Sequence, residues 1–253
     1  NAGYEFAGWY SGEEKVSDQS AYTFTATDDI ALNAKFIVTG NLIADGGFEG
    51  SALDSGWIHS NPADPNTKIV TDEHYEGNQA LIIYQKSGYP STSYSFQALP
   101  NTKYVLKMMV KIGAGTQYAA PYIHIGDDNG YNSLVNNRLI NDGGNIKEGD
   151  GWKESVITFT TASSTNIKMI IGSSVSAWAY IDNLSIKKVV NVKVTAENGT
   201  VSGLPNMVAA GDSLTLTAKA NAGYEFAGWY SGEEKVSDKS AYTFTATDDI
   251  ALT

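Results

Sequence analysis

The chain has 253 residues, of which 42% are hydrophobic, and its formal net charge is −11. This length and apolar content allow two or three small domains with cores of their own and exclude a disordered linker. The acidic balance argues against nucleic acid as a partner, because binding phosphates requires a basic surface. The absence of cysteine excludes disulfides and thiolate metal sites, and no apolar run is long enough to span a membrane.

The residue types favour strands over helices throughout the chain. Tyr, Thr, Val, Ile and Gly are abundant, and there are only 6 Pro. Such residues are typical of strands joined by tight turns. We therefore expect an all-β protein.

A long repeat frames the chain. Residues 1–32 return as residues 221–252 with one difference, Gln19 against Lys239. Copies this similar indicate duplication of one supersecondary unit. Repeated aromatic residues are more often core anchors than binding residues, so we look for function mainly between the copies.

The two copies predict related strands in different surroundings. In the first copy we expect strands over Tyr4–Tyr10, Ala21–Thr27 and Ile30–Phe36, from their alternating apolar residues. The second copy is preceded by a hairpin signal, Asn198-Gly199, and by a predicted strand, Ser213–Lys219.

Nothing equivalent precedes the first copy, so the chain begins inside a module and we expect it to be a fragment. Half a sheet exposes unpaired edges. We therefore expect residues 1–36 to pack on the middle domain or to pair with the edge of another chain.

Between the copies the sequence predicts a separate domain with regularly spaced strands. This count of strands, with turn-rich joints, is typical of a jelly-roll sandwich. The predicted domains are 1–39, 40–189 and 190–253. The predicted strands are Lys68–Val70, Ala80–Gln85, Thr92–Ala98, Tyr104–Ile112, Pro121–Ile125, Trp152–Thr160, Asn166–Gly172 and Tyr180–Lys187.

The repeated segments resemble a known bacterial module. GYEFAGW occurs in both copies, the first copy ends in NAKF, and the second follows a GTV hairpin and a GDSLTLTA strand. This pattern resembles the divergent internalin-B-type B-repeat, also called the bacterial repeat domain. The resemblance implies small β-grasp-like spacer or adhesive modules, truncated at the N-terminal end, on a secreted or cell-wall-attached bacterial protein.

The middle domain carries a second resemblance in six ordered motifs. They are NLIADGGFE from Asn41, GW at Gly56, YEGNQALII from Tyr75, NTKYVL from Asn101, GWKESVITFT from Gly151 and YIDNLSI from Tyr180. Together they resemble carbohydrate-binding modules of families 4, 9 and 22. The resemblance implies a galactose-binding-like jelly roll that binds a polysaccharide.

In those modules, matching acidic residues bind a structural calcium ion. The positions here are Glu49 and Asp182, and the resemblance adds backbone carbonyls of the loop that contains Gly77 and Asn78. Carboxylates and carbonyls are the hard oxygen ligands that calcium takes. The alternative is that both acids cap turns or pair with lysine.

Aromatic residues of the middle domain provide candidate sugar-binding positions, because sugar rings stack on flat aromatic faces beside polar partners. In PYIHIGDDNGYN the isoleucines Ile123 and Ile125 suit the core, so Tyr122 and His124 should face outward. We expect Trp57 and Trp152 in the core. The candidate ligand-binding residues are Tyr122, His124, Tyr118, Tyr131, Trp178, Asn129, Asn132, Asn136 and Arg138.

Catalysis by this chain is not expected. The three histidines lie in no metal-binding spacing, and no nucleophile elbow or phosphate loop occurs. A glycosidase needs two paired carboxyl groups. The available acids lie among Asn and Gly, where solvated turn residues are the default; they are Asp127, Asp128, Asp142, Glu148 and Asp150.

The sequence therefore favours non-catalytic binding of a β-glucan-like, xylan-like or starch-like polymer, without an organic cofactor. Such a module would hold a bacterial enzyme or cell against its glycan. Two alternatives stay open at this stage: an adhesin that binds a protein, and a structural stalk. The identity of the glycan is open too, because a fold does not fix its ligand.

Overall fold

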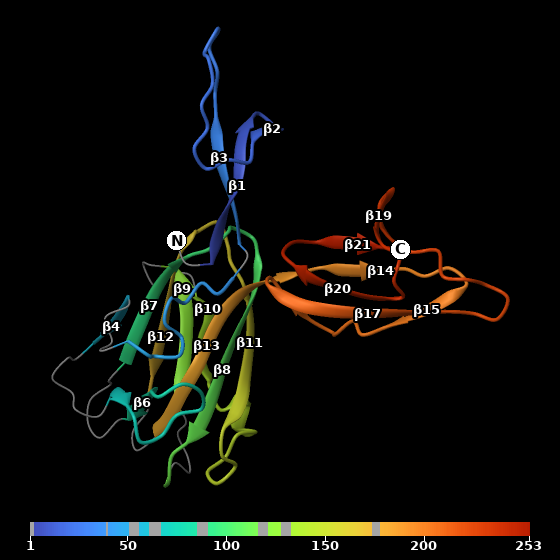
Figure 1. Ribbon diagram of the computed structural model, residues 1–253. Helices are drawn as coiled ribbons and strands as arrows, with labels where there is room; N and C mark the ends of the chain where they lie inside the picture. Colours follow the sequence, from blue (N-terminus) through green and yellow to red (C-terminus); the bar gives the residue numbers. More distant parts are fainter. Residues whose placement is uncertain are drawn as a thin grey trace. The chain divides into compact units, whose positions relative to one another are not determined.

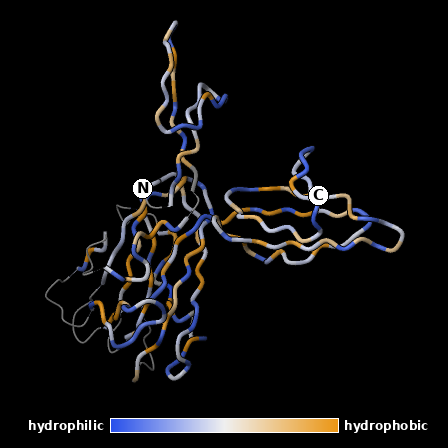
Figure 2. Tube along the Cα trace, viewed as in Figure 1, coloured by the Kyte–Doolittle hydropathy of each residue, from blue (hydrophilic) through white to orange (hydrophobic). Residues whose placement is uncertain are grey.

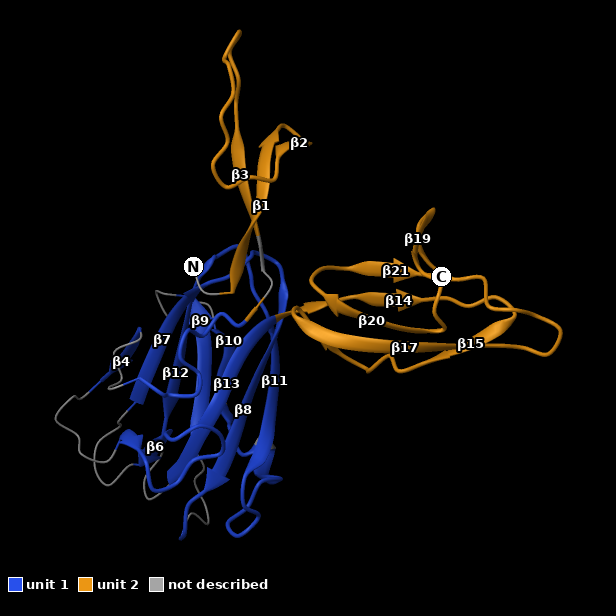
Figure 3. Cartoon of the chain, in the orientation of Figure 1, with its two compact units in different colours: residues 1–2, 41–187 blue, residues 3–40, 188–253 orange. Residues whose placement is uncertain are grey.

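A computed structural model describes residues 3–38, 40–50, 56–60, 67–84, 91–115, 121–127, 133–173 and 178–253. The chain divides into two compact units (Figure 3). One contains Asn41–Lys187, and the other contains Gly3–Gly40 and Lys188–Thr253. Apart from a 3-10 turn at Asp142–Gly144, the regular elements of these residues are all strands, as predicted. In the part of the chain described, no helix is long and apolar enough to cross a membrane.

The unit formed by Asn41–Lys187 contains a five-stranded sheet and the five-strand path of a six-stranded sheet, whose sixth strand, β16 (Val208–Ala209), pairs with the end of β13 (Figure 1). The first sheet, in the order β10-β9-β12-β7-β4, consists of β4 (Trp57–His59), β7 (Ser91–Gln97), β9 (Tyr122–Asp127), β10 (Ser133–Leu139) and β12 (Asn166–Gly172). The second sheet, in the order β11-β8-β13-β6-β5, consists of β5 (Lys68–Val70), β6 (Ala80–Tyr84), β8 (Lys103–Ile112), β11 (Lys153–Thr160) and β13 (Trp178–Val190). The predicted β-sandwich is confirmed.

Alternating side chains build the core of this sandwich. In β8 every second residue from Tyr104 to Ile112 is buried, and in β9 Ile123 and Ile125 are fully buried. Figure 2 shows hydrophobic and hydrophilic positions alternating along such strands. Because successive side chains of a strand point to opposite faces, the remaining positions form the outer faces of the two sheets.

The beginning and the end of the sandwich sequence lie side by side. Leu42 N donates to Ile186 O at 2.8 Å, and Leu184 N donates to the carbonyl of Gly46 at 2.8 Å. The Asn41 side chain strengthens this junction, because its Oδ1 accepts from Ile186 N at 2.8 Å. The opening NLI motif and the closing NLSI motif are therefore neighbours.

The C-terminal repeat forms its own set of small sheets. Its hydrophobic core contains Leu216, Trp229 and Leu252. Strands β15 and β20 flank β17, β14 pairs with β21 in parallel, β18 pairs with β19, and β16 pairs with the end of β13. The strands are β14 (Val192–Val194), β15 (Gly199–Ser202), β16 (Val208–Ala209), β17 (Asp212–Ala220), β18 (Trp229–Ser231), β19 (Glu234–Ser237), β20 (Ala241–Ala246) and β21 (Ile250–Leu252).

The N-terminal copy forms one sheet in the order β2-β1-β3, although its sequence is nearly that of residues 221–252. Its strands are β1 (Tyr4–Ser11), β2 (Glu14–Ser17) and β3 (Asn33–Val38). The strand predicted at Ala21–Thr27 is wrong, whereas the equivalent Ala241–Ala246 is strand β20. The difference lies in the pairing: β20 pairs with β17, whereas no described strand pairs with residues 21–27.

Two expectations for the C-terminal repeat are also corrected. Asn198 does turn the chain with a positive φ of 54°, but β14 pairs with β21 and β15 with β17, so no hairpin forms at Asn198-Gly199. The repeated aromatic residues, expected as core anchors, are so only in part: Phe226 packs against the core. Trp229 is buried, whereas Tyr224 is 55% exposed and precedes the strand.

The two copies allow a matched test of what the surrounding strands contribute. Trp229→Ala should destabilise the C-terminal repeat by about 3–5 kcal/mol, because it empties a buried core position. Trp9→Ala should cost much less, because Trp9 is only partly buried. Hydrogen exchange, followed by mass spectrometry on peptides from residues 33–38 and 212–220, which are unique to one copy each, measures both effects. Equal losses of protection would contradict the difference in packing.

Candidate functional site

The outer face of the first sheet presents two of the predicted ligand-binding residues. Tyr122 and His124 are partly exposed, while Ile123 and Ile125 between and beyond them are fully buried. The alternation read from the sequence is therefore confirmed for this strand. His124 lies opposite Ile170 of β12 in the register of the sheet.

Tyr122 lies across the neighbouring strand. Its register partner in β12 is Gly172, and a Cβ built on Gly172 would come within 2.6 Å of the Tyr122 hydroxyl and ring. The phenol thus covers a position where the sheet has no side chain. Farther along this face, Ile58 of β4 is 62% exposed, so the face is mixed in polarity.

The predicted polar partners are only partly placed. Asn136 and Arg138 are exposed on β10, the edge strand beside β9. Two register shifts interrupt the pairing of β10 with β9, and Leu139 is the residue opposite Tyr122. Four predicted residues lie outside the described part of the chain: Tyr118, Asn129, Tyr131 and Asn132.

Trp178 does not join this group, which corrects the predicted set. It begins β13 in the second sheet, and Ala179 and Ile181 of the same strand are fully buried. Trp178 therefore lies on the outer face of the second sheet, whereas Tyr122 and His124 lie on the outer face of the first. The motif pattern missed this because it contains no information on how strands are assigned to sheets.

Trp178 belongs instead to a continuous run of aromatic side chains, which we call the aromatic band. Each ring contacts the next with centroids 5.3–6.3 Å apart in tilted or T-shaped geometry. Such edge and tilted contacts are the favoured arrangement of aromatic pairs. The band consists, in order, of Tyr84, Trp178, Tyr180, Trp152 and Tyr75.

One end of the aromatic band forms a shallow open pocket. The pocket has a volume of about 280 Å³ and is lined by Ile82, Tyr84 and Trp178. The indole of Trp178 is fixed there, because its Nε1 donates to Ala114 O at 2.9 Å. A Cβ on Gly113 would lie 2.0 Å from the indole, so the ring rests directly on backbone.

The other end of the aromatic band carries a charged pair. Glu73 accepts hydrogen bonds from the Lys111 ammonium and, at 2.9 Å, from Trp152 Nε1. The hydrogen bond from Lys111, followed by that from Trp152, holds the pKa of Glu73 below its ordinary value. Burial raises the pKa of Tyr180, and the charges of Asp72 and Glu73 add to that effect.

Trp152 was expected in the core, and this expectation is wrong. Its indole is only partly buried, because the polar N–H pairs with Glu73 beside the second sheet. Trp57 is in the core as expected, with 5% exposure and ring contacts to Phe48 and Tyr94.

The predicted calcium residues meet at one loop, residues 75–79. Asp182 is fully buried, and its Oδ2 accepts from Tyr75 N at 2.8 Å and Glu76 N at 3.0 Å. Glu49 Oε1 accepts from the backbone N–H groups of residues 78 and 79 at 2.8 and 3.0 Å. We call this arrangement the acidic brace.

Gly77 and Asn78 take part in the acidic brace as predicted neighbours of Glu49. A Cβ on Gly77 would lie 2.3 Å from Glu49 Oε1, so a side chain there would displace the carboxylate. Asn78 Nδ2 lies 3.5 Å from Glu49 Oε2. The structure therefore brings all four predicted calcium residues to one place.

In the acidic brace, only the second carboxylate oxygen of each acid, Glu49 Oε2 and Asp182 Oδ1, is suited to bind calcium. Among the described residues, Glu49 Oε2 has a single long contact, and Asp182 Oδ1 accepts one bond, from Asn183 N at 2.6 Å. These oxygens retain lone pairs, and backbone carbonyls would have to supply the other ligands. The described residues contain no group of three or more His, Asp or Glu side chains arranged for a metal. Calcium stays a prediction.

Among the acids considered for catalysis, two serve as backbone acceptors. Glu148 Oε2 accepts from Gly115 N at 3.0 Å, and Asp150 Oδ2 accepts from Lys147 N at 2.9 Å. Asp127 is buried. Asp128 lies outside the described residues, as does the side chain of Asp142. Asp150 thus acts as a local turn residue, whereas Glu148 links its own loop to the distant Gly115.

The acidic brace generates a pH dependence. Backbone N–H donors from residues 78 and 79 lower the pKa of Glu49, so its contribution to stability is full above the unfolded pKa. That contribution is lost as the pH falls through the lower folded pKa. Glu49→Gln should therefore reduce the acid-dependent loss of stability, measured as thermal midpoints from pH 7 to pH 3. Parallel pH profiles for the variant and the parent chain would contradict this role.

Comparison with known proteins gives one family match and several similar structures. The Divergent InlB B-repeat domain family matches residues 1–39 and 190–253. No curated protein sequence matches this chain. Similar solved structures include a Family 16 Carbohydrate Binding Module-2, with 20% identity, 58% of this chain and 99% of that chain covered, and a TM-score of 0.40.

Two further similar structures are also carbohydrate-binding modules by name. The CBM22-1 xylan-binding domain of Paenibacillus barcinonensis Xyn10C is 16% identical, covers 59% of this chain and 96% of its own, and has a TM-score of 0.44. TmCBM61, solved with beta-1,4-galactotriose, is 18% identical, and the match covers 58% of this chain and 98% of that chain with a TM-score of 0.43. The two terminal segments thus match the Divergent InlB B-repeat domain, as their repeated GYEFAGW motif predicts.

Proposed function

We propose that the sandwich unit binds a polysaccharide without catalysing its cleavage, and that the aromatic band is the main contact surface. The observation that carries this proposal is the run of five touching aromatic rings at the second sheet. Its members are partly buried or, in the case of Tyr75, 48% exposed. An aromatic run of this kind on an outer face calls for a ligand or partner.

The chemistry of the aromatic band suits a sugar chain. The apolar C–H face of a pyranose ring would stack on Trp178 and Tyr84 beside the shallow pocket. Farther along, Glu73 and Lys111 are both partly exposed and offer a carboxylate and an ammonium to sugar hydroxyls. The Tyr180 hydroxyl can also donate a hydrogen bond to a sugar oxygen.

The outer face of the first sheet is the second candidate contact surface. Tyr122 and His124 lie there, but the described residues supply fewer aromatic neighbours than at the second sheet. We therefore rank this face below the aromatic band. The glycan itself stays open among β-glucan-like, xylan-like and starch-like polymers.

The flanking segments support an extracellular setting. Both match the Divergent InlB B-repeat domain, and resemblance to this module implies a bacterial surface protein. A secreted or wall-attached protein would use the sandwich to hold itself on a glycan. Repetition of such modules would raise avidity when single sites bind weakly. A protein-binding adhesin and a structural stalk are the competing outcomes.

We also propose that the acidic brace binds a structural calcium ion. Glu49 and Asp182 would hold it through the oxygens that each accept one contact, Oε2 and Oδ1. The ion would link the opening segment, the loop of residues 75–79 and β13. Its effect would be on stability, because calcium would bind only the folded arrangement.

The glycan proposal is tested by affinity gel electrophoresis against soluble β-glucan, xylan, starch and galactan. Trp178→Ala should weaken retardation by about ten-fold in dissociation constant, or about 1.4 kcal/mol, because a stacking platform is lost. Tyr122→Ala is the matched control on the other sheet and should change little. Retardation abolished by Tyr122→Ala alone would move the site to the first sheet. If no polymer retards the chain, the glycan proposal is wrong and a protein-binding adhesin or a structural stalk is the remaining function.

The calcium proposal is tested by thermal unfolding of the whole chain in calcium and in chelator. At about one hundred times the dissociation constant, calcium should raise the melting temperature of the sandwich by about 5–10 °C. Asp182→Asn should remove this shift, and magnesium at equal ionic strength controls for charge screening. Identical melting temperatures in calcium and in chelator would rule the ion out.

A further inference from the structure

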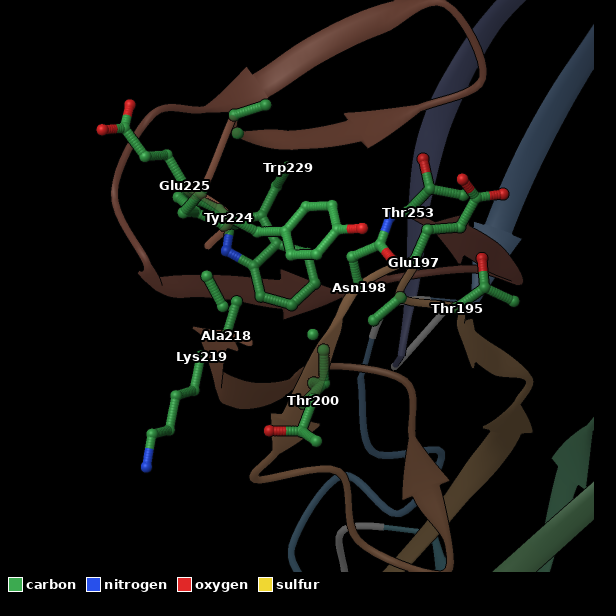
Figure 4. Close-up of a pocket in the computed structure, with 17 residues that line it drawn as sticks. Thr195, Glu197, Asn198, Thr200, Ala218, Lys219, Tyr224, Glu225, Trp229 and Thr253 are labelled. Atoms are coloured by element: carbon green, nitrogen blue, oxygen red, sulfur yellow. The ribbon is translucent and has the colours of Figure 1, made fainter. Parts of the chain in front are cut away.

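Two strands of the C-terminal repeat that lie far apart in the sequence, β14 and β21, pair side by side and in parallel (Figure 1). Val192 lies opposite Ile250, and Val194 lies opposite Leu252. The two strands also end together, because the residues that follow them, Thr195 and Thr253, line the same pocket (Figure 4). The chain therefore passes through this pair twice in the same direction.

The parallel direction decides how tension along the chain would load the pair. Tension pulls β14 back toward residue 191 and pulls β21 forward toward residue 253. In a parallel pair these two pulls slide the strands past each other along their length. Because the backbone hydrogen bonds of a parallel pair are evenly spaced along the strands, sliding loads them together rather than one after another.

Hydrogen bonds fasten the pair at both ends. Ile250 N donates to Asn191 O at 3.0 Å, and Thr195 N donates to Leu252 O at 2.9 Å. The Asp249 carboxylate reinforces the first end, because it accepts from Asn191 N at 2.8 Å and from Asn191 Nδ2 at 3.0 Å. These backbone and side-chain bonds from Asn191 hold the pKa of Asp249 below its ordinary value. The acceptor is therefore charged, and hydrogen bonds to a charged acceptor are the stronger kind.

The side chains of the pair are anchored in the core of the repeat. Leu252 is buried in one cluster with Leu216 and Trp229, and Val194 and Ile250 pack against that cluster. Sliding either strand would draw these side chains out of the core, at a cost that grows with the apolar area exposed. The pair thus resists sliding through hydrogen bonds and through burial at once.

The same tension would load the sandwich in a different way. Its opening segment runs antiparallel to the end of β13, with Leu42 N donating to Ile186 O and Leu184 N donating to Gly46 O. The chain enters this unit at residue 41 and leaves it at residue 187. Both pulls therefore act at one end of the junction, which would peel open bond by bond from Leu42 and Ile186 onward.

We propose that the C-terminal repeat bears tension along the chain, and that the β14–β21 pair with Asn191 and Asp249 is its mechanical clamp. Under load the clamp holds while the sandwich gives way first. This function belongs to the repeat itself and does not depend on whether the sandwich binds a glycan. A spacer of this kind keeps its length when the protein that contains it is pulled.

Pulling single molecules of the whole chain in two directions tests this function. Forced unfolding is governed by the unfolding barrier rather than by equilibrium stability, so only a true clamp makes the force depend on direction. Lys193 and Ala251 are exposed register partners, and the chain has no cysteine of its own. Handles on the double variant Lys193→Cys, Ala251→Cys separate the strands sideways, whereas handles on the chain ends of the same variant slide them.

The repeat should resist several-fold more force with handles on the chain ends than with handles on the cysteines. In the pulls from the ends the sandwich should unfold first. The two events are told apart by released length, roughly 500 Å for residues 41–187 and roughly 200 Å for residues 190–253 at about 3.4 Å per residue. Equal forces in the two directions, or a repeat that unfolds before the sandwich, would overturn the proposal.

A second variant tests the fastened end of the clamp. Asp249→Ala removes two hydrogen bonds from Asn191 and should lower the force at which the repeat unfolds when it is pulled from the chain ends. Asp238→Ala is the matched control, because Asp238 is an exposed acid of the same repeat outside the clamp. An Asp249→Ala repeat as resistant as the Asp238→Ala repeat would contradict the clamp.

Discussion

A β-strand persists only where a neighbouring strand satisfies its backbone N–H and C=O groups, and this constraint governs the whole chain. The two copies of the repeat show it directly. AYTFTA forms β20 at Ala241–Ala246 because β17 lies beside it, yet the same letters near Ala21 form no strand. GYEFAGW shows the converse: it is a strand where β3 pairs with it and largely irregular at residues 223–228.

In the sandwich the same requirement is met partly by side chains. Four backbone N–H groups of loop 75–79 donate to carboxylates: those of residues 75 and 76 donate to Asp182, and those of residues 78 and 79 donate to Glu49. Hydrogen bonds to a charged acceptor are stronger than those between neutral groups. These donors explain how Asp182 can be fully buried, because a buried carboxylate requires hydrogen-bond donors. Any cation there would add to a junction that already fixes the opening and closing segments together.

The strands of the sandwich were largely predictable because alternation is a local signal. Lys68–Val70 and Asn166–Gly172 agree with the structure to the residue. The short β4 at Trp57–His59 and the irregular β10 at Ser133–Leu139 were missed. Neither shows regular alternation: β4 has three residues, and two register shifts interrupt the pairing of β10 with β9.

The candidate sites were less predictable, because they depend on which sheet a strand joins. Tyr122 and His124 were placed correctly on an outer face, since a single strand decides that. Trp178 was grouped with them, and Trp152 with the core, because linear motifs do not show which residues share a sheet. The residues of the acidic brace were named together because the resemblance to carbohydrate-binding modules implied them as calcium ligands, and the structure brings them to one loop.

An outward-facing aromatic residue in a sandwich must be stabilised by something other than the core. Trp178 rests on Gly113 and bonds to Ala114 O, and Trp152 bonds to Glu73. These contacts fix each indole in place while leaving it partly exposed, so little side-chain entropy remains to be lost when a ligand arrives. The aromatic band is therefore preorganised for the proposed sugar contact. Its rigidity is what a binding surface for a flat, weakly held ring requires.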